Sequence, residues 1–313
     1  MSLKEIKTRI QSVQNTRKIT SAMKMVASAK LHHAQEAIFS MLPYQTMLYG
    51  ILSRFLAEGE SVQTEYQQER ELSNVALIVF SSNSSLCGAF NSNMMKHFTE
   101  VAKHYEQTLG KEHILVYPIG RKIADYVKKS GYQPQGDFTR LADKPDYTQA
   151  QALATELMEM FRKGKVDRVE LLYNHFKNTA TQIYMHELLL PLDVESCLKS
   201  NLLQKKTNLS DNQDSIPNDN RNNAHEGDIK SNYIIEPSVE ELLTNLLPKV
   251  IRLKLFTSLL DSNASEHGAR TVAMQIATDN ADDLLNELGI LYNKTRQQAI
   301  TNELLDIVAG SFK

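Results

Sequence analysis

The sequence predicts an α/β fold in which long helices from the two ends of the chain form an antiparallel coiled coil beside a small central domain. Three observations support this prediction. Glycine is absent from residues 1–49 and from residues 228–267, which allows long helices at both ends. Short apolar runs alternate with helical patterns between residues 74 and 191. The start of the chain is basic and its end is acidic, so the two ends attract each other.

The N-terminal segment, residues 1–58, is expected to form the first coiled-coil helix. Apolar residues recur at spacings of three and four, the pattern of a helix seam, at Leu3, Ile6, Ile10 and Val13. The next seam positions, Arg17, Thr20 and Lys24, are polar, and the apolar pattern resumes at Ala27. The polar stretch therefore interrupts the seam inside a helix. We expect Pro43 to kink or break this helix, because proline removes a backbone hydrogen bond.

The C-terminal segment, residues 237–311, is expected to form the second coiled-coil helix. Ser238 and Glu241 have the spacing of a capping box at its start. Positions seven residues apart form its seam, which thins to small or polar residues in the middle: Leu246, Leu253, Leu260, His267, Met274, Ala281 and Leu288. We expect a break or bend near Pro248, since an interior proline costs a helix about 3 kcal/mol.

Charge predicts how the two helices pair. Residues 1–33 contain seven basic side chains and one acidic side chain, whereas residues 261–313 contain eight acidic and four basic side chains. An antiparallel hairpin brings these segments together, and the longer C-terminal helix then projects beyond the start of the chain. The projecting part would expose Leu304, Leu305, Ile307 and Val308 to a partner. Alternatively, both helices fold back onto the central domain.

The central domain, residues 72–195, is expected to be a small Rossmann-like α/β unit. The predicted strands are 74–80, 113–118, 167–174 and 179–191, with the last two as an antiparallel pair at one edge. The predicted helices are 92–107, 120–130 and 147–164, the first of them capped by Asn91 or Ser92. Residues 196–232 are rich in Asn and Asp and are expected to form a flexible polar insertion.

Composition excludes several classes of function. The net charge of −2 gives no reason to expect a nucleic acid partner. Two cysteines, Cys87 and Cys197, cannot form a disulfide framework, which favours a reducing compartment. No apolar run approaches the roughly 20 residues of a membrane span, so we expect no direct insertion into a membrane.

The sequence offers little evidence of an active site. The loop 81–88 follows the first strand, where an α/β sheet holds ligands, but it lacks the glycine motifs that bind phosphate. Cys87 in this loop is a candidate nucleophile with His97 or His104, although lone cysteines are usually small buried apolar residues. His32 and His33 are adjacent on a helix and point about 100° apart, which places them poorly to share a metal. We expect no catalytic residue, cofactor or metal.

Two long terminal motifs and one short central motif resemble the gamma subunit of bacterial F-type ATP synthases. The terminal motifs are IKTRIQSVQNTRKITSAMKMVASAKL and SEHGARTVAMQIATDNADDLLNELGILYNKTRQQAITNELLDIVAG, and the central motif is LCGAFN. The resemblance covers roughly residues 3–195 and 233–311. It implies a rotary central stalk whose helices pass through a ring of three alpha and three beta subunits. The α/β domain would lie at the foot, against the epsilon subunit and the membrane c-ring.

The resemblance also implies a site, a role and a location. The chain would couple ion-driven rotation to ATP synthesis, and to hydrolysis in reverse, without catalysing a reaction itself. It would be peripheral, at the cytoplasmic face of the bacterial inner membrane. Its expected contacts with the alpha/beta ring are Lys18, Met23, Lys24, Arg270, Arg296, Gln297, Thr301, Glu303 and Asp306.

Two questions stay open at this point. The small side chains around Met23 either keep adhesion to the ring weak or simply let two helices pack closely. A passive coiled-coil scaffold would also share the long helices. One departure from the family concerns the loop: Thr-Asp-Arg-Gly is common before Leu-Cys-Gly, but Ser82, Asn83, Ser84 and Ser85 stand here.

Overall fold

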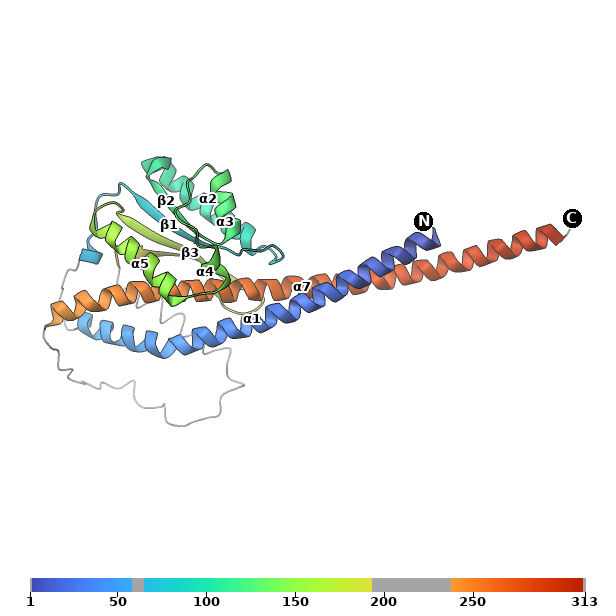
Figure 1. Ribbon diagram of the computed structural model, residues 1–313, viewed down its shortest axis with the longest axis horizontal. Helices are drawn as coiled ribbons and strands as arrows, with labels where there is room; N and C mark the ends of the chain where they lie inside the picture. The colour runs from blue at the N-terminus through green and yellow to red at the C-terminus, as the bar shows by residue number, and fades with distance from the viewer. Residues whose placement is uncertain (1, 58–64, 193–237, 312–313) are drawn as a thin grey trace, which may run out of the picture.

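The computed structural model describes residues 2–57, 65–192 and 238–311. Two long helices run side by side out of a small α/β domain, as Figure 1 shows. The predicted fold class is therefore confirmed. The expected polar insertion 196–232 and Cys197 lie outside the described residues.

The central domain contains one four-stranded mixed sheet in the order β2-β1-β3-β4. The strands β1 and β2 and the strands β1 and β3 pair in parallel, whereas β3 and β4 form the predicted antiparallel pair at one edge. The strand bounds are Val75–Phe80 for β1, Ile114–Ile119 for β2, Arg168–Phe176 for β3 and Gln182–Leu190 for β4.

Helices cover both faces of this sheet. All six residues of β1 are buried, as expected for a strand between two layers. Val75, Leu77 and Val79 face a core shared with α2 and α3, while the alternate β1 residues face a larger core shared with α5, α7 and the end of α1. The helix bounds are Phe90–Leu109 for α2, Arg121–Lys129 for α3, Thr139–Asp143 for α4 and Tyr147–Arg162 for α5. Two short 3-10 helices, η1 and η2, are Glu65–Gln67 and Lys111–His113.

The two long helices are α1, Leu3–Ala57, with 55 residues, and α7, Val239–Ser311, with 73 residues. At 1.5 Å per residue they measure about 80 and 110 Å. Residues 243–260 of α7 pack against the domain, and the buried apolar side chains among them belong to its core. Beyond this part, α7 pairs with α1 and then continues alone past the N-terminus (Figure 1). The alternative in which both helices fold back onto the domain is therefore wrong.

Of the two outcomes predicted at each proline, a break or a bend, the break is wrong. Pro43 lies inside α1 and Pro248 lies inside α7, and each helix continues through its proline. Both prolines have buried apolar residues close to them in sequence, including Leu48 and Leu247. Burial of such side chains is worth about 1.5–3 kcal/mol each, which offsets the cost of the proline.

The predicted caps had different outcomes. The hydroxyl of Ser238 accepts a hydrogen bond from the backbone N–H of Glu241 at 3.2 Å, which is half of the predicted capping box. The expected cap of α2 by Asn91 or Ser92 is wrong, because α2 begins at Phe90 and Ala89 caps it without a side-chain bond. The side chain of Asn91 instead binds the loop before the helix. Among the described residues, no helix combines the length and apolar character that crossing a lipid bilayer requires.

Candidate functional site

We define the helical stem as residues 3–30 of α1 and 268–311 of α7, where the two long helices extend away from the α/β domain. Its two helices are antiparallel: Arg17 forms an ion pair with Asp282, and the hydroxyl of Thr278 donates to Thr20 at 2.9 Å. The charge-based pairing predicted from the sequence is therefore confirmed. Polar seam positions of α1 are used to bind α7.

A narrow apolar seam holds the stem together. All seven predicted seam positions of α7, from Leu246 to Leu288, are buried, and three of them, Met274, Ala281 and Leu288, belong to the stem. On α1 the buried stem residues include Ile6, at 0% exposure, and Ala27, at 2%. Small residues at the seam thus serve close helix packing, which supports that interpretation for Ala27. Other residues of the same stretch stay on the surface, notably Ile19, Met25 and Val26.

Most of the predicted ring-contact residues lie on the outside of the stem. Lys18 is exposed, and Met23 and Lys24 are half-buried beside α7. The predicted contacts near the C-terminus are all exposed: Arg296, Gln297, Thr301, Glu303 and Asp306. They share the end of α7 with Leu304, Leu305, Ile307 and Val308, each of which is more than half exposed.

Arg270 is the exception, because its side chain is bound within the chain. It is 9% exposed, its Nη1 lies 2.6 Å from a carboxylate oxygen of Glu266, and its Nη2 donates to the hydroxyl of Ser84 at 2.8 Å. Ser84 belongs to the loop that departs from the family pattern. Arg270 therefore makes an internal contact between α7 and this loop, while its contact with a surrounding ring stays a prediction.

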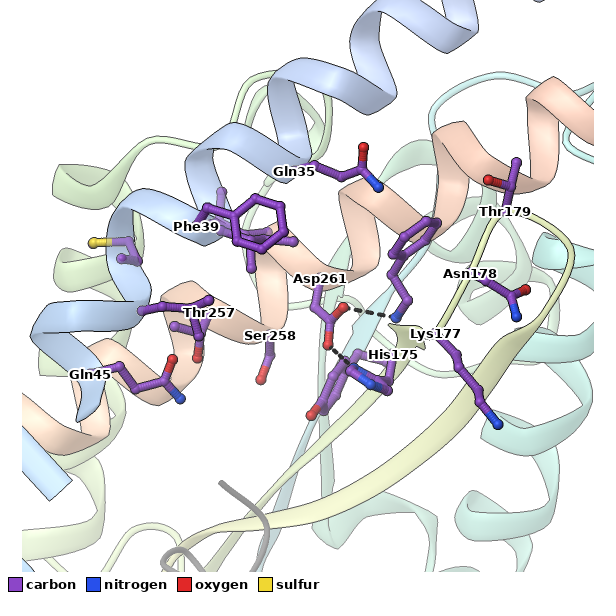
Figure 2. A pocket seen from close by; sticks show the side chains of 16 residues that line it. Gln35, Phe39, Gln45, His175, Lys177, Asn178, Thr179, Thr257, Ser258 and Asp261 are labelled. Carbon is purple, nitrogen blue, oxygen red and sulfur yellow. Dashed lines mark hydrogen bonds and ion pairs between the residues drawn. The ribbon is translucent and has the colours of Figure 1, made fainter. Parts of the chain in front are cut away.

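A series of directional bonds fixes α7 to the domain, and we call these contacts the polar joint. At its centre, Asp261 accepts hydrogen bonds from the backbone N–H of Phe176 at 2.8 Å and from Nδ1 of His175 at 2.5 Å. Figure 2 shows Asp261 pointing from α7 toward the end of β3, beside a cavity of about 470 Å³ between α1, β3 and α7.

Other polar side chains of α7 extend the joint on both sides of Asp261. The ammonium of Lys254 donates to the carbonyl of Leu188 at 3.0 Å and lies 3.4 Å from the carboxylate of Glu187. Asn263 donates to the carbonyl of Ala142 at 3.0 Å, and Ser265 donates to the carbonyl of Asn174 at 2.9 Å. Apolar contacts tolerate sliding, but directional bonds specify position, so the joint sets the register of α7 on the domain.

The sequence contained a signal for this joint that its interpretation missed. The α7 seam thins to small or polar residues in its middle, and no internal contact was predicted there. In the structure, polar residues of this part of α7, among them Lys254, Asn263 and Ser265, are buried and bonded to the domain. Buried polar groups are usually hydrogen-bonded, so their clustering was a sign of an internal polar contact.

Burial and hydrogen bonding shift the pKa values at the centre of the joint. Burial raises the pKa of Asp261, and the nearby His175 only partly opposes this effect. Burial would lower the pKa of His175, but the hydrogen bond and the charge of Asp261 outweigh it and raise that pKa. Both groups thus hold protons more tightly than usual.

The pKa of His267, in contrast, is lowered. Burial, together with the positive charges of Arg270 and Lys30, lowers the pKa of His267 to about 4. The unfolded chain therefore binds a proton at His267 near pH 6.5, and the folded chain does so only near pH 4. In that window the unfolded state binds more protons, so acidification destabilises the fold.

We expect His267→Gln to reduce the acid sensitivity of the chain. Between pH 7 and pH 5 the wild type should lose about 2 kcal/mol of its free energy of unfolding through this one group. Urea denaturation of both proteins at the two pH values measures the difference. His104→Gln, on the exposed side of α2, is the matched control and should follow the wild type. Identical pH dependence in the His267 variant and the wild type would contradict the expectation.

The loop around Cys87 gives no support to a catalytic cysteine. Cys87 is 1% exposed, and its sulfur lies 3.1 Å from the side-chain nitrogen of Asn91. The ring of His97 stacks on Tyr184 at 3.7 Å between centroids. Cys87 therefore packs as a small buried residue in a loop that Ser82, Asn91 and Arg270 hold by hydrogen bonds.

The fold and the stem define a structural class: a small α/β domain from which an antiparallel pair of long helices projects, one longer than the other. Among solved structures, the chain is similar to one from the Euglena gracilis mitochondrial ATP synthase rotor, with a TM-score of 0.56, 17% identity, and coverage of 95% of this chain and 98% of that one. Another Euglena ATP synthase structure, described as OSCP/F1/c-ring, matches with a TM-score of 0.60, 18% identity, and coverage of 99% and 93%.

Sequence comparisons define the family more closely. The family model described as ATP synthase matches residues 2–312. The chain is 54% identical over 310 residues to the ATP synthase gamma chain of Phocaeicola vulgatus, with 99% of each chain covered. It is 42% identical over 312 residues to that of Flavobacterium johnsoniae, with 99% of this chain and 98% of the relative covered. The chain belongs to the ATP synthase gamma chain family.

Proposed function

We propose that this chain is the central stalk of a rotary ATP synthase. It couples rotation driven by ion flow to conformational cycling of the alpha/beta catalytic sites, for ATP synthesis and for hydrolysis in reverse. The proposal rests on two observations together. The chain is a member of the gamma chain family. Its stem consists of two paired helices that the domain fixes at one end, that are exposed along their outer faces, and of which α7 extends alone beyond α1.

The proposed partners follow from the two ends of the molecule. Three alpha and three beta subunits surround the stem, while the epsilon subunit and the c-ring bind the α/β domain. The chain itself carries out no bond chemistry and is a peripheral component at the cytoplasmic face of the inner membrane. Exposed apolar residues at the end of α7, such as Leu304 and Ile307, support a protein environment there, because they lie in a continuous exposed stretch.

The outer face of the stem supports movement within a ring. Burying one leucine is worth about 1.5–3 kcal/mol, so ten gripped leucines would hold a shaft at one angle by about 15–30 kcal/mol. Around residues 18–24 the exposed side chains are those of Lys18, Ile19 and Ala22, so a single large apolar side chain is offered there, and Met23 and Lys24 are half-buried. Lys18, Met23 and Lys24 are proposed to contact acidic loops of the beta subunits, where positive charge attracts without apolar adhesion.

The polar joint supports transmission of torque. A shaft that turns a ring of subunits must not rotate within its own foot. The bonds of Asp261, Asn263 and Ser265 reach β3 and α4 from one helix. Rotation of the domain therefore carries α7 with it, and α7 carries α1 through the stem seam.

The test is reconstitution of cooperative ATP hydrolysis. Alpha and beta subunits are assayed for steady-state turnover with the full chain, without it, and with an unrelated antiparallel coiled coil of similar length. We expect cooperative turnover only with the full chain, because an asymmetric stalk biases three otherwise equivalent sites. A passive scaffold would bind the subunits without altering their turnover, so equal turnover in all three mixtures would refute the proposal.

A further inference from the structure

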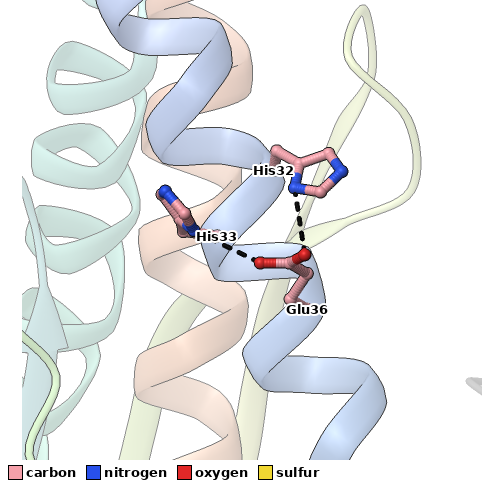
Figure 3. A group of neighbouring side chains, drawn as sticks. All are labelled: His32, His33 and Glu36. Carbon is pink, nitrogen blue, oxygen red and sulfur yellow. Dashed lines mark hydrogen bonds and ion pairs between the residues drawn. The ribbon is translucent and has the colours of Figure 1, made fainter.

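Two histidines and a glutamate converge on the exposed side of α1, next to the point where the stem meets the domain. Figure 3 shows His32 and His33 on either side of the Glu36 carboxylate. Nδ1 of His32 lies 3.4 Å from one carboxylate oxygen, and Nδ1 of His33 lies 3.2 Å from the other. One ligand atom from each residue falls within 4.8 Å of the others. In the described part of the chain this is the one such three-residue group.

The backbone beneath this group is held in place by packing. Leu31 and Ala34 are 6% and 7% exposed and pack against Ala264 of α7. Side chains at 32, 33 and 36 therefore leave the helix on the side away from α7, where all three are exposed. A cation can reach them without any opening of the fold.

The ligand atoms lie close enough for one ion after small rotations of exposed side chains. Zinc bonds nitrogen and oxygen at about 2.0–2.1 Å, which places neighbouring ligand atoms about 3.3 Å apart at tetrahedral angles. Each His-to-Glu distance is close to this value, but the two end on different oxygens of the carboxylate, and the three ligand atoms lie within 4.8 Å of one another. We propose that His32, His33 and Glu36 form a binding site for one divalent cation of the zinc class.

The chemistry of the donors selects the ion. Two imidazole nitrogens and one carboxylate suit Zn²⁺, and they disfavour Mg²⁺, which prefers a shell of oxygen atoms. Three protein ligands leave the fourth position of a tetrahedral ion open to water or to a group from a neighbouring molecule. The site does not depend on the proposed rotary function.

This proposal departs from the expectation drawn from the sequence. His32 and His33 were expected to be poorly placed to share a metal because adjacent helical residues point about 100° apart. That argument considered the two rings alone. Glu36 lies one turn further along the helix, between the two directions, and each ring turns its Nδ1 toward it.

The experiment is a titration of the untagged full-length chain with Zn²⁺, measured by isothermal titration calorimetry. We expect one saturable equivalent at this group, with no response to Mg²⁺. His33→Gln and Glu36→Gln should each weaken binding at least about tenfold, since even the loss of a supporting residue costs metal sites 10–100-fold. Co²⁺ serves as a second probe, because a site with imidazole ligands gives it a visible absorption band that both variants should lose.

Matched controls make the result decisive. His104→Gln removes an exposed histidine from α2 and should leave zinc binding unchanged. Circular dichroism of every variant establishes that the fold is intact, which is expected because all three positions are exposed. Absence of saturable zinc binding, or equal affinity in the wild type, His33→Gln and Glu36→Gln, would overturn the proposal and leave the group as hydrogen-bonded surface side chains.

Discussion

Replacing Asp261 by alanine is expected to destabilise the chain by about 3–5 kcal/mol, the cost of breaking a buried ionic contact by removing one partner. The substitution leaves two donors without an acceptor, Nδ1 of His175 and the backbone N–H of Phe176. Both lie where β3 meets α7. Urea denaturation followed by far-UV circular dichroism measures the change in the free energy of unfolding.

A matched variant separates the shape of Asp261 from its charge. Asp261→Asn keeps the volume and one acceptor for the Phe176 N–H, and its amide can donate to the neutral ring of His175. We therefore expect Asp261→Asn to lose less than half of what Asp261→Ala loses. A double-mutant cycle with His175→Gln should give a coupling energy above about 0.5 kcal/mol, since the two groups are in contact. Additive effects of the two substitutions would show that the interaction between Asp261 and His175 contributes nothing to the free energy of unfolding.

Hydrogen exchange gives the local consequence of the same variant. If Asp261 holds α7 against the domain, Asp261→Ala should lose amide protection in β3 and in the adjoining turns of α7 before the sheet interior. The strand β1, buried on both faces, is the internal reference. A uniform loss of protection in β1 and β3 would mean that Asp261 supports global stability without acting as a local joint.

Much of the fold was predictable from spacing and charge. The seven seam positions of α7 from Leu246 to Leu288 are all buried, because a heptad repeat defines one helix face wherever that face is covered. The same repeat does not say what covers it. Its first part packs against the sheet domain and its last part packs against α1, a change of partner that periodicity does not record.

The side-chain contacts of the joint were not predictable in the same way. A polar residue at a seam position is compatible with water, with a partner subunit or with an internal bond. Arg270 shows the difficulty, since the family resemblance implied a contact with the ring and gave no sign of its contacts within the chain. Its actual partners, Glu266 and Ser84, are respectively four residues away and in a distant loop. The loop contact depends on the tertiary fold, and the departure at Ser84 hid it further.

The break predicted as one outcome at each proline was wrong for a related reason. Local rules assign an interior proline its intrinsic cost, but the packing that compensates for it is a property of the whole domain. Leu48 and Leu52 follow Pro43 and are buried in the main core. The expected break in α1 would have separated these residues from the rest of the helix, so the continuous helix is favoured.

Glu266→Gln is expected to destabilise the chain by about 3–5 kcal/mol, because it leaves the guanidinium of Arg270 buried without an anion. Glu266 and Arg270 are 6% and 9% exposed, and their charged atoms lie 2.6 Å apart. Burial raises the pKa of Glu266, while the charge and hydrogen bond of Arg270 oppose that rise. The pair therefore depends on both members for its stability.

The double variant Glu266→Gln with Arg270→Met distinguishes loss of the pair from loss of a residue. The double variant no longer contains the Arg270 guanidinium that Glu266→Gln leaves without an anion. We therefore expect it to recover most of the stability that Glu266→Gln alone loses. Asp282→Asn, which breaks the exposed pair with Arg17, is the control on the same helix and should cost at most about 1 kcal/mol. Urea denaturation of the four proteins measures all of these differences. If Glu266→Gln costs no more than Asp282→Asn, the contact between α7 and the loop at Ser84 does not depend on the buried charge pair.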